Sequence, residues 1–266
     1  MSFSGSMSDP DFRKYIWKPF NKGIFRYDMI HPGDRIAVCI SGGKDSMLLA
    51  KCMKQLRSYG KPDFQIVFLA MDPGYTVGVR NRIMQNCASM DIPVMMYETK
   101  VFESAGKSGK NPCFSCSRLR RGWLYKKASE LGCNKIALGH HFDDVIETIL
   151  MGMLYGSQMQ TMMPRLRSEN YPGMELIRPL YLVREENIIQ WQQETGLDFE
   201  RCACRLTEKN DNGSKRLEIK MLLRQLREIN PAVDMNIFRS AENVNLRKLI
   251  SYHIGSEYHS FLDDLN

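Results

Sequence analysis

The stretch Ser41-Gly42-Gly43-Lys44-Asp45-Ser46 decides the fold, and it directly follows the apolar run RIAVCI at residues 35–40. An apolar run that breaks at a Ser/Gly turn and continues as the amphipathic segment MLLAKCMKQL predicts a buried strand, a tight loop and a helix. Such a loop directs several backbone N–H groups along the N-terminus of the helix, where anionic phosphate is favoured. The sequence therefore predicts a phosphate-binding loop at residues 41–46.

The loop differs from the Walker pattern, because one residue precedes the glycine pair and Asp45 separates Lys44 from Ser46. A tight turn with a conventional N-cap would explain an isolated Ser-Gly-Gly. The complete six-residue string after a strand favours the anion-binding interpretation.

Apolar runs at 64–72, 92–97 and 134–139 predict further strands, and helices are predicted at 77–90, at 117–131 and from the turn at 139–144 through Leu154. This alternation predicts an α/β fold with a doubly wound, Rossmann-like parallel sheet and right-handed crossovers. In such sheets ligands bind beyond the carboxyl ends of the strands. The segments SGGKDS, AMDPGY (70–75) and GHHFDD (139–144) all fall at those ends.

Beyond Leu154 the pattern weakens, and residues 158–178 are expected to form an irregular or hairpin-like excursion. Helices are predicted at 185–195, 215–228 and 241–252, with a mobile loop at 210–214. We expect an N-terminal lead-in and helix at 1–30, a nucleotide-binding domain at 31–200 and a helical C-terminal segment at 201–266.

The charge of +7 and pI of 8.9 favour an anionic partner. Two groups of basic residues lie near the cysteine pairs. The first follows Cys116 and comprises Arg118, Arg120, Arg121, Lys126 and Lys127. The second surrounds or follows Cys202 and Cys204 and comprises Arg201, Arg205, Lys209, Lys215, Arg216, Lys220, Arg224 and Arg227. Each charge alone is also explained by a solvated helix face. Apolar stretches are far shorter than the roughly 20 residues of a membrane span, and the N-terminus lacks a signal pattern. We therefore expect a cytoplasmic protein without a membrane partner.

The eight cysteines differ in spacing. Four stand alone and suit small buried side chains: Cys39, Cys52, Cys87 and Cys133. Cys113 and Cys116 form a C-x-x-C pair, and Cys202 and Cys204 form a C-x-C pair. Without a secretory signal, paired spacing favours metal or redox chemistry over a disulfide framework.

These motifs together resemble those of the PP-loop ATPases that modify tRNA, and more narrowly those of the tRNA 2-thiocytidine synthetases. The shared motifs are SGGKDS, Pro112-Cys-Phe-Ser-Cys116, the run at 138–144 with Glu147 and Thr148, and Arg178-Pro-Leu180. The resemblance covers residues from about 14 to about 250. It implies an N-type ATP pyrophosphatase fold, in which ATP adenylates a base carbonyl and a sulfur donor displaces AMP.

Adenylation suits the loop, because its N–H groups and Lys44 can stabilise charge on the transferring phosphate. Asp45, Asp143 and Asp144 can hold Mg²⁺, with Glu147 one turn further along the helix. N-capping is the alternative role of Asp143 and Asp144. His140 and His141 can orient nucleotide or base, or simply satisfy local hydrogen bonds. The predicted ATP-binding residues are Ser41, Gly42, Gly43, Lys44, Asp45, Ser46, Ala70, Arg121, Gly139, His140 and Asp144.

The resemblance also implies three cysteines holding a [4Fe–4S] cluster that delivers sulfur. Cys113 and Cys116 match the family's pair, whereas either Cys202 or Cys204 can be the third ligand. A zinc site from all four thiols is the rival, although C-x-C is a less common zinc half-site. Free thiols are the remaining alternative. We predict Lys44, Asp45, Cys113 and Cys116 as the catalytic residues.

The expected partners are tRNA and a sulfur donor, either a cysteine desulfurase or sulfide, and a homodimer is possible for such enzymes. Phe142, Tyr75 and Trp123 can stack on a splayed base or belong to the core. A uridine thiolase stays open, and a lysidine-type cytidine ligase would need no cysteine cluster. A nucleotide-binding regulatory protein without catalysis is the alternative from another class, which tRNA-dependent pyrophosphate release would exclude.

Overall fold

The structure is a computed structural model that describes residues 6–60, 62–102, 112–200 and 215–265. The chain divides into two compact units. Unit 1 comprises Met1–Val145 and Met163–Ser214, and unit 2 comprises Ile146–Met162 and Lys215–Asn266. The three-part division expected from the sequence stays a prediction.

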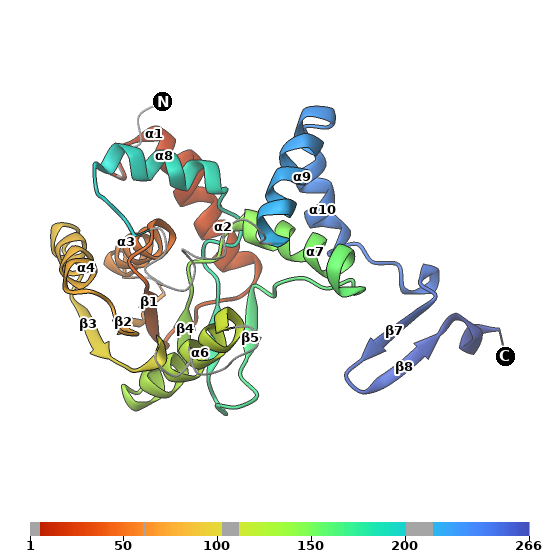
Figure 1. Cartoon of the computed structure of the whole chain (residues 1–266), viewed down its shortest axis with the longest axis horizontal. Coiled ribbons are helices and arrows are strands. Elements are labelled where there is room, and N and C mark those ends of the chain that lie inside the picture. The colour runs from red at the N-terminus through yellow and green to blue at the C-terminus, as the bar shows by residue number, and fades with distance from the viewer. Residues whose placement is uncertain (1–5, 61, 103–111, 201–214, 266) are drawn as a thin grey trace. The chain divides into compact units, whose positions relative to one another are not determined.

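Unit 1 is built on a six-stranded sheet with the strand order β3-β2-β1-β4-β6-β5 (Figure 1). Its strands are β1 (Arg35–Ile40), β2 (Gln65–Asp72), β3 (Val94–Glu98), β4 (Lys135–Ala137), β5 (Arg165–Arg167) and β6 (Glu175–Ile177). Every neighbouring pair is parallel except β5 and β6, which are antiparallel. The predicted parallel α/β sheet is confirmed.

Helices connect and cover these strands. The N-terminal helical stretch runs through α1 (Pro10–Phe12), a π-helical turn (Arg13–Trp17) and α2 (Lys18–Arg26). The helices after it are α3 (Lys44–Ser58), α4 (Val77–Ser89), α6 (Pro112–Glu130), α7 (Phe142–Gly156) and α8 (Glu185–Thr195). The boundary between the two units falls within α7, after Val145.

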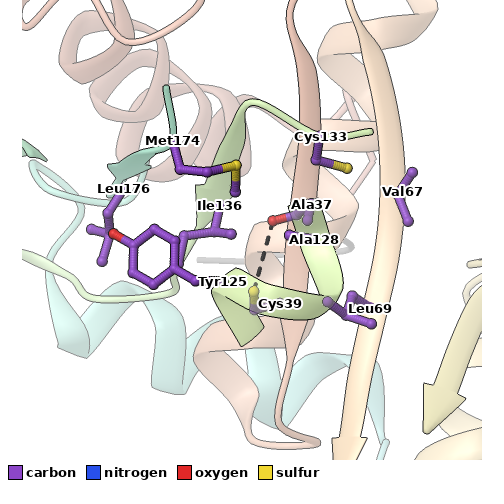
Figure 2. Packing of buried hydrophobic residues seen from close by; sticks show 10 residues of the cluster. All are labelled: Ala37, Cys39, Val67, Leu69, Tyr125, Ala128, Cys133, Ile136, Met174 and Leu176. Atoms are coloured by element: carbon purple, nitrogen blue, oxygen red, sulfur yellow. Dashed lines mark hydrogen bonds between the residues drawn. The ribbon is translucent and has the colours of Figure 1, made fainter. Parts of the chain in front are cut away.

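Both faces of β1 are buried, as a central parallel strand requires. Ala37 and Cys39 point into a core cluster that also contains Tyr125 and Ala128 of α6, shown in Figure 2. The alternate residues of the strand, Ile36, Val38 and Ile40, are buried as well. Because successive side chains of a strand point to opposite faces, these three lie on the other face of the sheet.

In unit 1, one helix begins earlier than the sequence predicted, and the expected hairpin-like stretch is present but joins the main sheet. Helix α6 begins at Pro112 rather than at residue 117, so that Cys113 and Cys116 lie within the helix. The stretch expected to be irregular or hairpin-like contains the antiparallel pair β5–β6. Strand β6 also pairs in parallel with β4 and thereby joins the main sheet, which the local sequence did not indicate.

Unit 2 contains the second part of α7, α9 (Lys215–Ile229), α10 (Val233–Ser240) and the hairpin β7–β8 (Ser251–Ile254 and Glu257–Ser260). Short 3₁₀ turns occur at Leu246–Lys248 and Phe261–Asp264. Within this unit, the buried Glu147 carboxylate lies 3.3 Å from Arg216 Nε and 3.6 Å from Lys220 Nζ. These ion pairs join α9 to the second part of α7.

The helix predicted at 241–252 is wrong. Residues 251–254 form strand β7, and the two-residue turn Gly255-Ser256 leads into β8. Gly255 has a φ of +62°, a left-handed conformation that glycine adopts without steric cost. Within the described residues, no helix is long and apolar enough to cross a membrane.

Candidate functional site

The loop at residues 41–46 is a tight turn closed by its own serines. Gly43 is the N-cap of α3 with φ −79° and ψ 157°, and Lys44 is the first helical residue. Ser46 Oγ accepts a hydrogen bond from Ser41 N at 3.1 Å and donates to Gly43 O at 2.9 Å. Since glycine has no side chain to cap the helix, the N–H groups of the first turn remain suited to an anion.

Gly42 is required by the geometry of this turn. Its φ is +85°, and a Cβ there would lie 2.6 Å from the Ile83 side chain. Its carbonyl oxygen accepts a hydrogen bond from Glu200 N at 3.1 Å. A larger residue would be strained by its own backbone and by α4 at once.

The Lys44 ammonium group lies between two carboxylates. Its Nζ is 2.9 Å from Asp45 Oδ1 and 3.2 Å from Glu185 Oε1. Burial by itself would lower the pKa of Lys44, but the charges and hydrogen bonds of Asp45 and Glu185 outweigh it and raise that pKa. Lys44 is therefore a cation held at the N-terminus of α3.

The N-terminus of α7 is closed by a reciprocal pair of hydrogen bonds. His141 N donates to Asp144 Oδ2 at 3.1 Å, and Asp144 N donates to His141 Nδ1 at 3.4 Å. This is the geometry of a capping box, with histidine in the place usually taken by Ser or Thr. Because Nδ1 accepts a hydrogen bond from Asp144 N, we assign the imidazole proton to Nε2.

His141 Nε2 is directed toward three carboxylates. It lies 3.8 Å from Asp45 Oδ1, 3.5 Å from Asp144 Oδ2 and 3.8 Å from Glu185 Oε1, and the His141 side chain is only 4% exposed. The structure thus brings the loop at residues 41–46, the turn after β4 and the start of α8 to one place, at the carboxyl ends of the strands.

Gly139 and Ala70 explain how close these segments are. A Cβ on Gly139 would lie 3.0 Å from the backbone of Asp45 and of Ser46. Ala70 is buried on β2 and lies opposite Ile40 in the sheet, and Ile40 is the residue that directly precedes the loop. Both predicted residues therefore border the loop through backbone proximity rather than through a functional group.

Asp143 has a role that the sequence did not indicate. Its Oδ2 accepts a hydrogen bond from Glu185 N at 2.7 Å and lies 3.8 Å from Arg184 Nε. N-capping of α7 was the alternative considered for Asp143 and Asp144: Asp144 takes part in the capping box of α7, whereas Asp143 accepts a hydrogen bond from the first N–H of α8. Among the described residues, no group of three or more His, Cys, Asp or Glu side chains is arranged to hold a metal ion.

A buried arginine lies beside His140. Arg178 Nε donates to His140 Nδ1 at 3.3 Å, and its Nη1 donates to Met163 O. Burial, and after it the neighbouring positive charge of Arg121, lower the pKa of Arg178 to about 10, so Arg178 remains a cation at neutral pH. Arg121 itself is exposed on α6. A second cation so near a buried one favours an anion between or beside them.

The cysteine site is described in part. Cys113 and Cys116 lie three residues apart on α6, and Cys116 is reduced and 7% exposed. Cys116 packs with Met71 and Val101, beside the partly buried Trp123. The side chain of Cys113, and both Cys202 and Cys204, lie outside the described residues, as does the loop expected at 210–214.

The three aromatic candidates belong to packed surroundings. Phe142 is buried, and the Arg184 guanidinium lies 4.8 Å from the centre of its ring. Trp123 borders two core clusters, and Tyr75 contacts Phe102 edge-on with ring centres 5.9 Å apart. Their contacts favour the core interpretation.

Sequence reasoning missed Glu185. It lies 141 positions from Lys44 in the chain, and nothing in its local sequence connects the two. The available indication was its place in the acidic first turn of a helix that follows a strand of the same sheet. An acidic helix start at the carboxyl edge of the sheet identifies a side chain that can reach a ligand there.

Comparisons with known proteins agree with this geometry. The family model described as PP-loop domain matches residues 12–211. The chain is 35% identical over 249 residues to the tRNA-cytidine(32) 2-sulfurtransferase of Pelobacter propionicus, covering 92% of this chain and 91% of that protein. It is 34% identical over 252 residues to the protein of the same name from Coxiella burnetii, covering 93% and 96%.

A solved structure is also similar. The U34-tRNA thiolase NcsA from Methanococcus maripaludis, solved with its [4Fe-4S] cluster, has a TM-score of 0.67 and 21% sequence identity. The match covers 86% of this chain and 78% of that one. At this identity the similarity supports the fold.

Proposed function

The chain belongs to the PP-loop family and, within it, to the tRNA-cytidine(32) 2-sulfurtransferases, and from this premise we propose that it is an ATP-dependent enzyme that converts a tRNA cytidine to 2-thiocytidine. One observation carries the proposal: the similarity extends over 91% and 96% of two relatives with this name. The loop at residues 41–46 supplies the ATP chemistry that such a reaction needs.

The first half of the reaction activates the base. The C2 carbonyl oxygen of cytidine attacks the α-phosphorus of ATP, and pyrophosphate leaves. The N–H groups of the first turn of α3 and the Lys44 ammonium stabilise the negative charge that develops on the phosphates. The second half replaces oxygen by sulfur at C2, and AMP is then a far better leaving group than oxide.

We propose that Mg²⁺ enters with the nucleotide. Magnesium is commonly bound by one or two carboxylates together with substrate phosphates and water, rather than by an all-protein cage. Asp45 and Asp144 fit this description, since both carboxylates approach the same His141 nitrogen next to the loop. Asp143 and Glu147 are less suitable, because the first caps α8 and the second pairs with Arg216 and Lys220.

The residues present also suit an iron–sulfur cluster. Cys113 and Cys116 are three positions apart on α6, a spacing at which helical residues are neighbours, and the Cys116 thiol is reduced and shielded from water. Cys113, Cys116 and one of Cys202 or Cys204 would hold a [4Fe–4S] cluster. Such a cluster with three protein ligands supplies an iron position to which sulfur can bind.

The remaining partners follow from the same proposal. tRNA is the substrate, and the exposed Arg121 on α6 is suited to contact its phosphates or those of ATP. The sulfur donor, either a cysteine desulfurase or sulfide, and a homodimer are predictions that stand beside it. The uridine thiolases differ in the base that they activate, and the lysidine-type ligation needs no cysteine pair.

The test is a nucleoside analysis. The full chain, reconstituted with iron and sulfide without oxygen, is incubated with tRNA and ATP, and the digested tRNA is examined by mass spectrometry. We expect 2-thiocytidine together with AMP and pyrophosphate. Formation of 2-thiouridine or lysidine instead, or no modified nucleoside, would contradict the proposal.

A cysteine series tests the sulfur half separately. Cys113→Ala and Cys116→Ala should lose both the iron-dependent visible absorbance and thiolation, while ATP binding persists. Cys133→Ala is the matched control, because Cys133 is a buried free thiol just beyond the same helix. Full thiolation by either of the first two variants would remove the cluster assignment.

A further inference from the structure

Glu185 is the one described carboxylate from outside the loop that forms an ion pair with Lys44. The Glu185 side chain is 22% exposed and that of Lys44 is 20% exposed, so the pair is largely shielded from water. An ammonium group that binds phosphate must exchange its present partners for phosphate oxygens. The strength of the Lys44–Glu185 contact therefore opposes phosphate binding.

Glu185 is fixed in place by its backbone. It is the first residue of α8, and its N–H donates to Asp143 Oδ2 at 2.7 Å. A carboxylate in the first turn of a helix is also stabilised by the partial positive charge of that helix end. Glu185 is thus a rigid acceptor placed opposite the loop, whereas Lys44 has a long and flexible side chain.

His141 offers the carboxylates a second donor. Its Nε2 lies 3.8 Å from both Asp45 Oδ1 and Glu185 Oε1, and its Nδ1 is occupied by the hydrogen bond from Asp144 N. When Lys44 moves toward a phosphate, the N–H at Nε2 remains near both carboxylates. These two partly shielded carboxylates then keep a donor nearby, which lowers the cost of the exchange.

We propose that Glu185 is a positioning residue that holds Lys44 in the nucleotide-free protein and releases it to the phosphates of the nucleotide. When Lys44 leaves, His141 replaces it as the donor to the Glu185 carboxylate. This inference rests on the proposed ATP-dependent function. In this arrangement Glu185 competes directly with phosphate for Lys44, so its removal makes phosphate binding tighter.

The experiment measures binding of inorganic pyrophosphate to the full chain by calorimetry, without divalent cations. Glu185→Gln keeps the size of the side chain and the backbone hydrogen bond to Asp143, and it should lower the Kd by about fivefold, the factor expected for a partly shielded ion pair. Glu186→Gln is the matched control. Glu186 is the next residue of α8, it is 75% exposed, and its substitution should leave the Kd unchanged.

A double substitution identifies the route of the effect. In a Lys44→Ala background, the gain from Glu185→Gln should disappear, because the carboxylate no longer has an ammonium group to retain. An equal gain in that background would mean direct repulsion between Glu185 and pyrophosphate and would overturn the proposal. A wild-type Kd in Glu185→Gln, a weaker one, or no binding by any variant would overturn it too.

Pyrophosphate binding is independent of thiolation, so the two proposals fail separately. A chain that shows this binding pattern but forms no 2-thiocytidine would refute the proposed function alone. Far-UV circular dichroism of each variant confirms that the fold is retained. If Glu185 had a purely structural role, the effect of Glu185→Gln on the Kd for pyrophosphate would not depend on whether Lys44 is present.

Discussion

In unit 1, one lysine lies between two carboxylates at the amino ends of the strands, and another lies between two carboxylates at their carboxyl ends. The two lysines differ in what else surrounds them. At the amino ends of the strands, Lys135 Nζ lies 2.7 Å from Asp34 Oδ2 and 3.6 Å from Glu175 Oε2. It also lies 3.0 Å from Met29 O and 3.1 Å from His31 Nδ1, and its side chain is only 3% exposed. These partners enclose the ammonium group.

At the carboxyl ends, Lys44 has a similar pair of acidic partners but a different setting. It lies at the N-terminus of α3, beside two glycines, and one-fifth of its side chain is exposed. A ligand can therefore replace its partners, whereas a ligand at Lys135 would have to displace the protein's own backbone. The enclosed cluster around Lys135 is suited to stabilise the fold, whereas the cluster around Lys44 is suited to exchange its carboxylate partners for a ligand.

Replacing Lys44 should have the largest effect on chemistry. Lys44→Met should lower tRNA-dependent pyrophosphate release by about 10²–10³-fold, because a preorganised cation is lost at the transferring phosphate. The free energy of unfolding should change little. The measurement is pyrophosphate release with tRNA and ATP, and Lys54→Met, on the same helix, is the control. Normal release by Lys44→Met would remove the loop lysine from catalysis.

Replacing Lys135 should have the opposite pattern. Lys135→Met leaves the buried Asp34 carboxylate without its cation, whereas Glu175 keeps its ion pair with Arg165, so the free energy of unfolding should fall by about 3 kcal/mol. Lys54 pairs with the exposed Asp91, and Lys54→Met should cost less than about 0.5 kcal/mol. Urea denaturation measures both. A Lys135 variant as stable as the Lys54 variant would show that the buried cluster does not hold the sheet.

A smaller effect is expected at Gly139, where the two segments of the site touch. Gly139→Ala would push a Cβ to 3.0 Å from the Asp45 backbone and shift the first turn of α3 by a few tenths of an ångström. We expect about a tenfold loss of pyrophosphate release, because such shifts misalign the reacting groups. Gly78→Ala is the control, since no atom lies within 4 Å of its added Cβ. Equal activity of the two variants would contradict this.

The smallest expected effect is a loss of folding stability at acid pH, caused by the carboxylates around Lys135 at the amino ends of the strands. Burial alone would raise the pKa of Asp34, but hydrogen bonds from Lys135, the His31 backbone and Asn134 hold it below its ordinary value of 3.8. The hydrogen bond from Arg165 likewise lowers the pKa of Glu175. Both carboxylates therefore contribute stability above their ordinary pKa values, and that stability is lost as the pH falls through the lowered ones.

The matching variant is Asp34→Asn. Its melting temperature should be below that of the wild type at pH 6, and the difference between the two melting temperatures should narrow by about 2–4 °C as the pH falls below 4. Asp63→Asn, at an exposed position that pairs with Arg57, is the control and should run parallel to the wild type. Melting curves recorded between pH 3 and pH 6 check this, and a constant difference for Asp34→Asn would contradict the assignment.

Much of unit 1 could be predicted from the sequence, because its determinants are local. Strands β1 and β2 are continuous apolar runs, and α8 was predicted at the residues where it lies.

In unit 2, the hairpin β7–β8 was missed, although a Gly-Ser turn between short alternating segments indicates one. The helical pattern was extended past Asn243 and Asn245, which favour caps and turns over helix interiors.

The candidate site was predictable where the motif is contiguous. Ser41, Gly42 and Lys44 follow one another, so the turn is determined by their own backbone preferences. The role of Asp143 was not predictable in this way, because its partner, Glu185 N, lies 42 positions further along the chain. An aspartate at a helix start suits both metal binding and capping, and only the neighbouring helix decides between them.

The sequence by itself determined the Ser/Gly turn at residues 41–46, the parallel α/β sheet and the placement of Cys113 and Cys116 on one segment, because each depends on residues a few positions apart. Only the tertiary structure decided that Glu185 faces Lys44, that His141 faces three carboxylates, and that β6 lies beside β4. These contacts join segments distant in the chain, and they form only when the burial of both faces of the sheet brings the ends of its strands together.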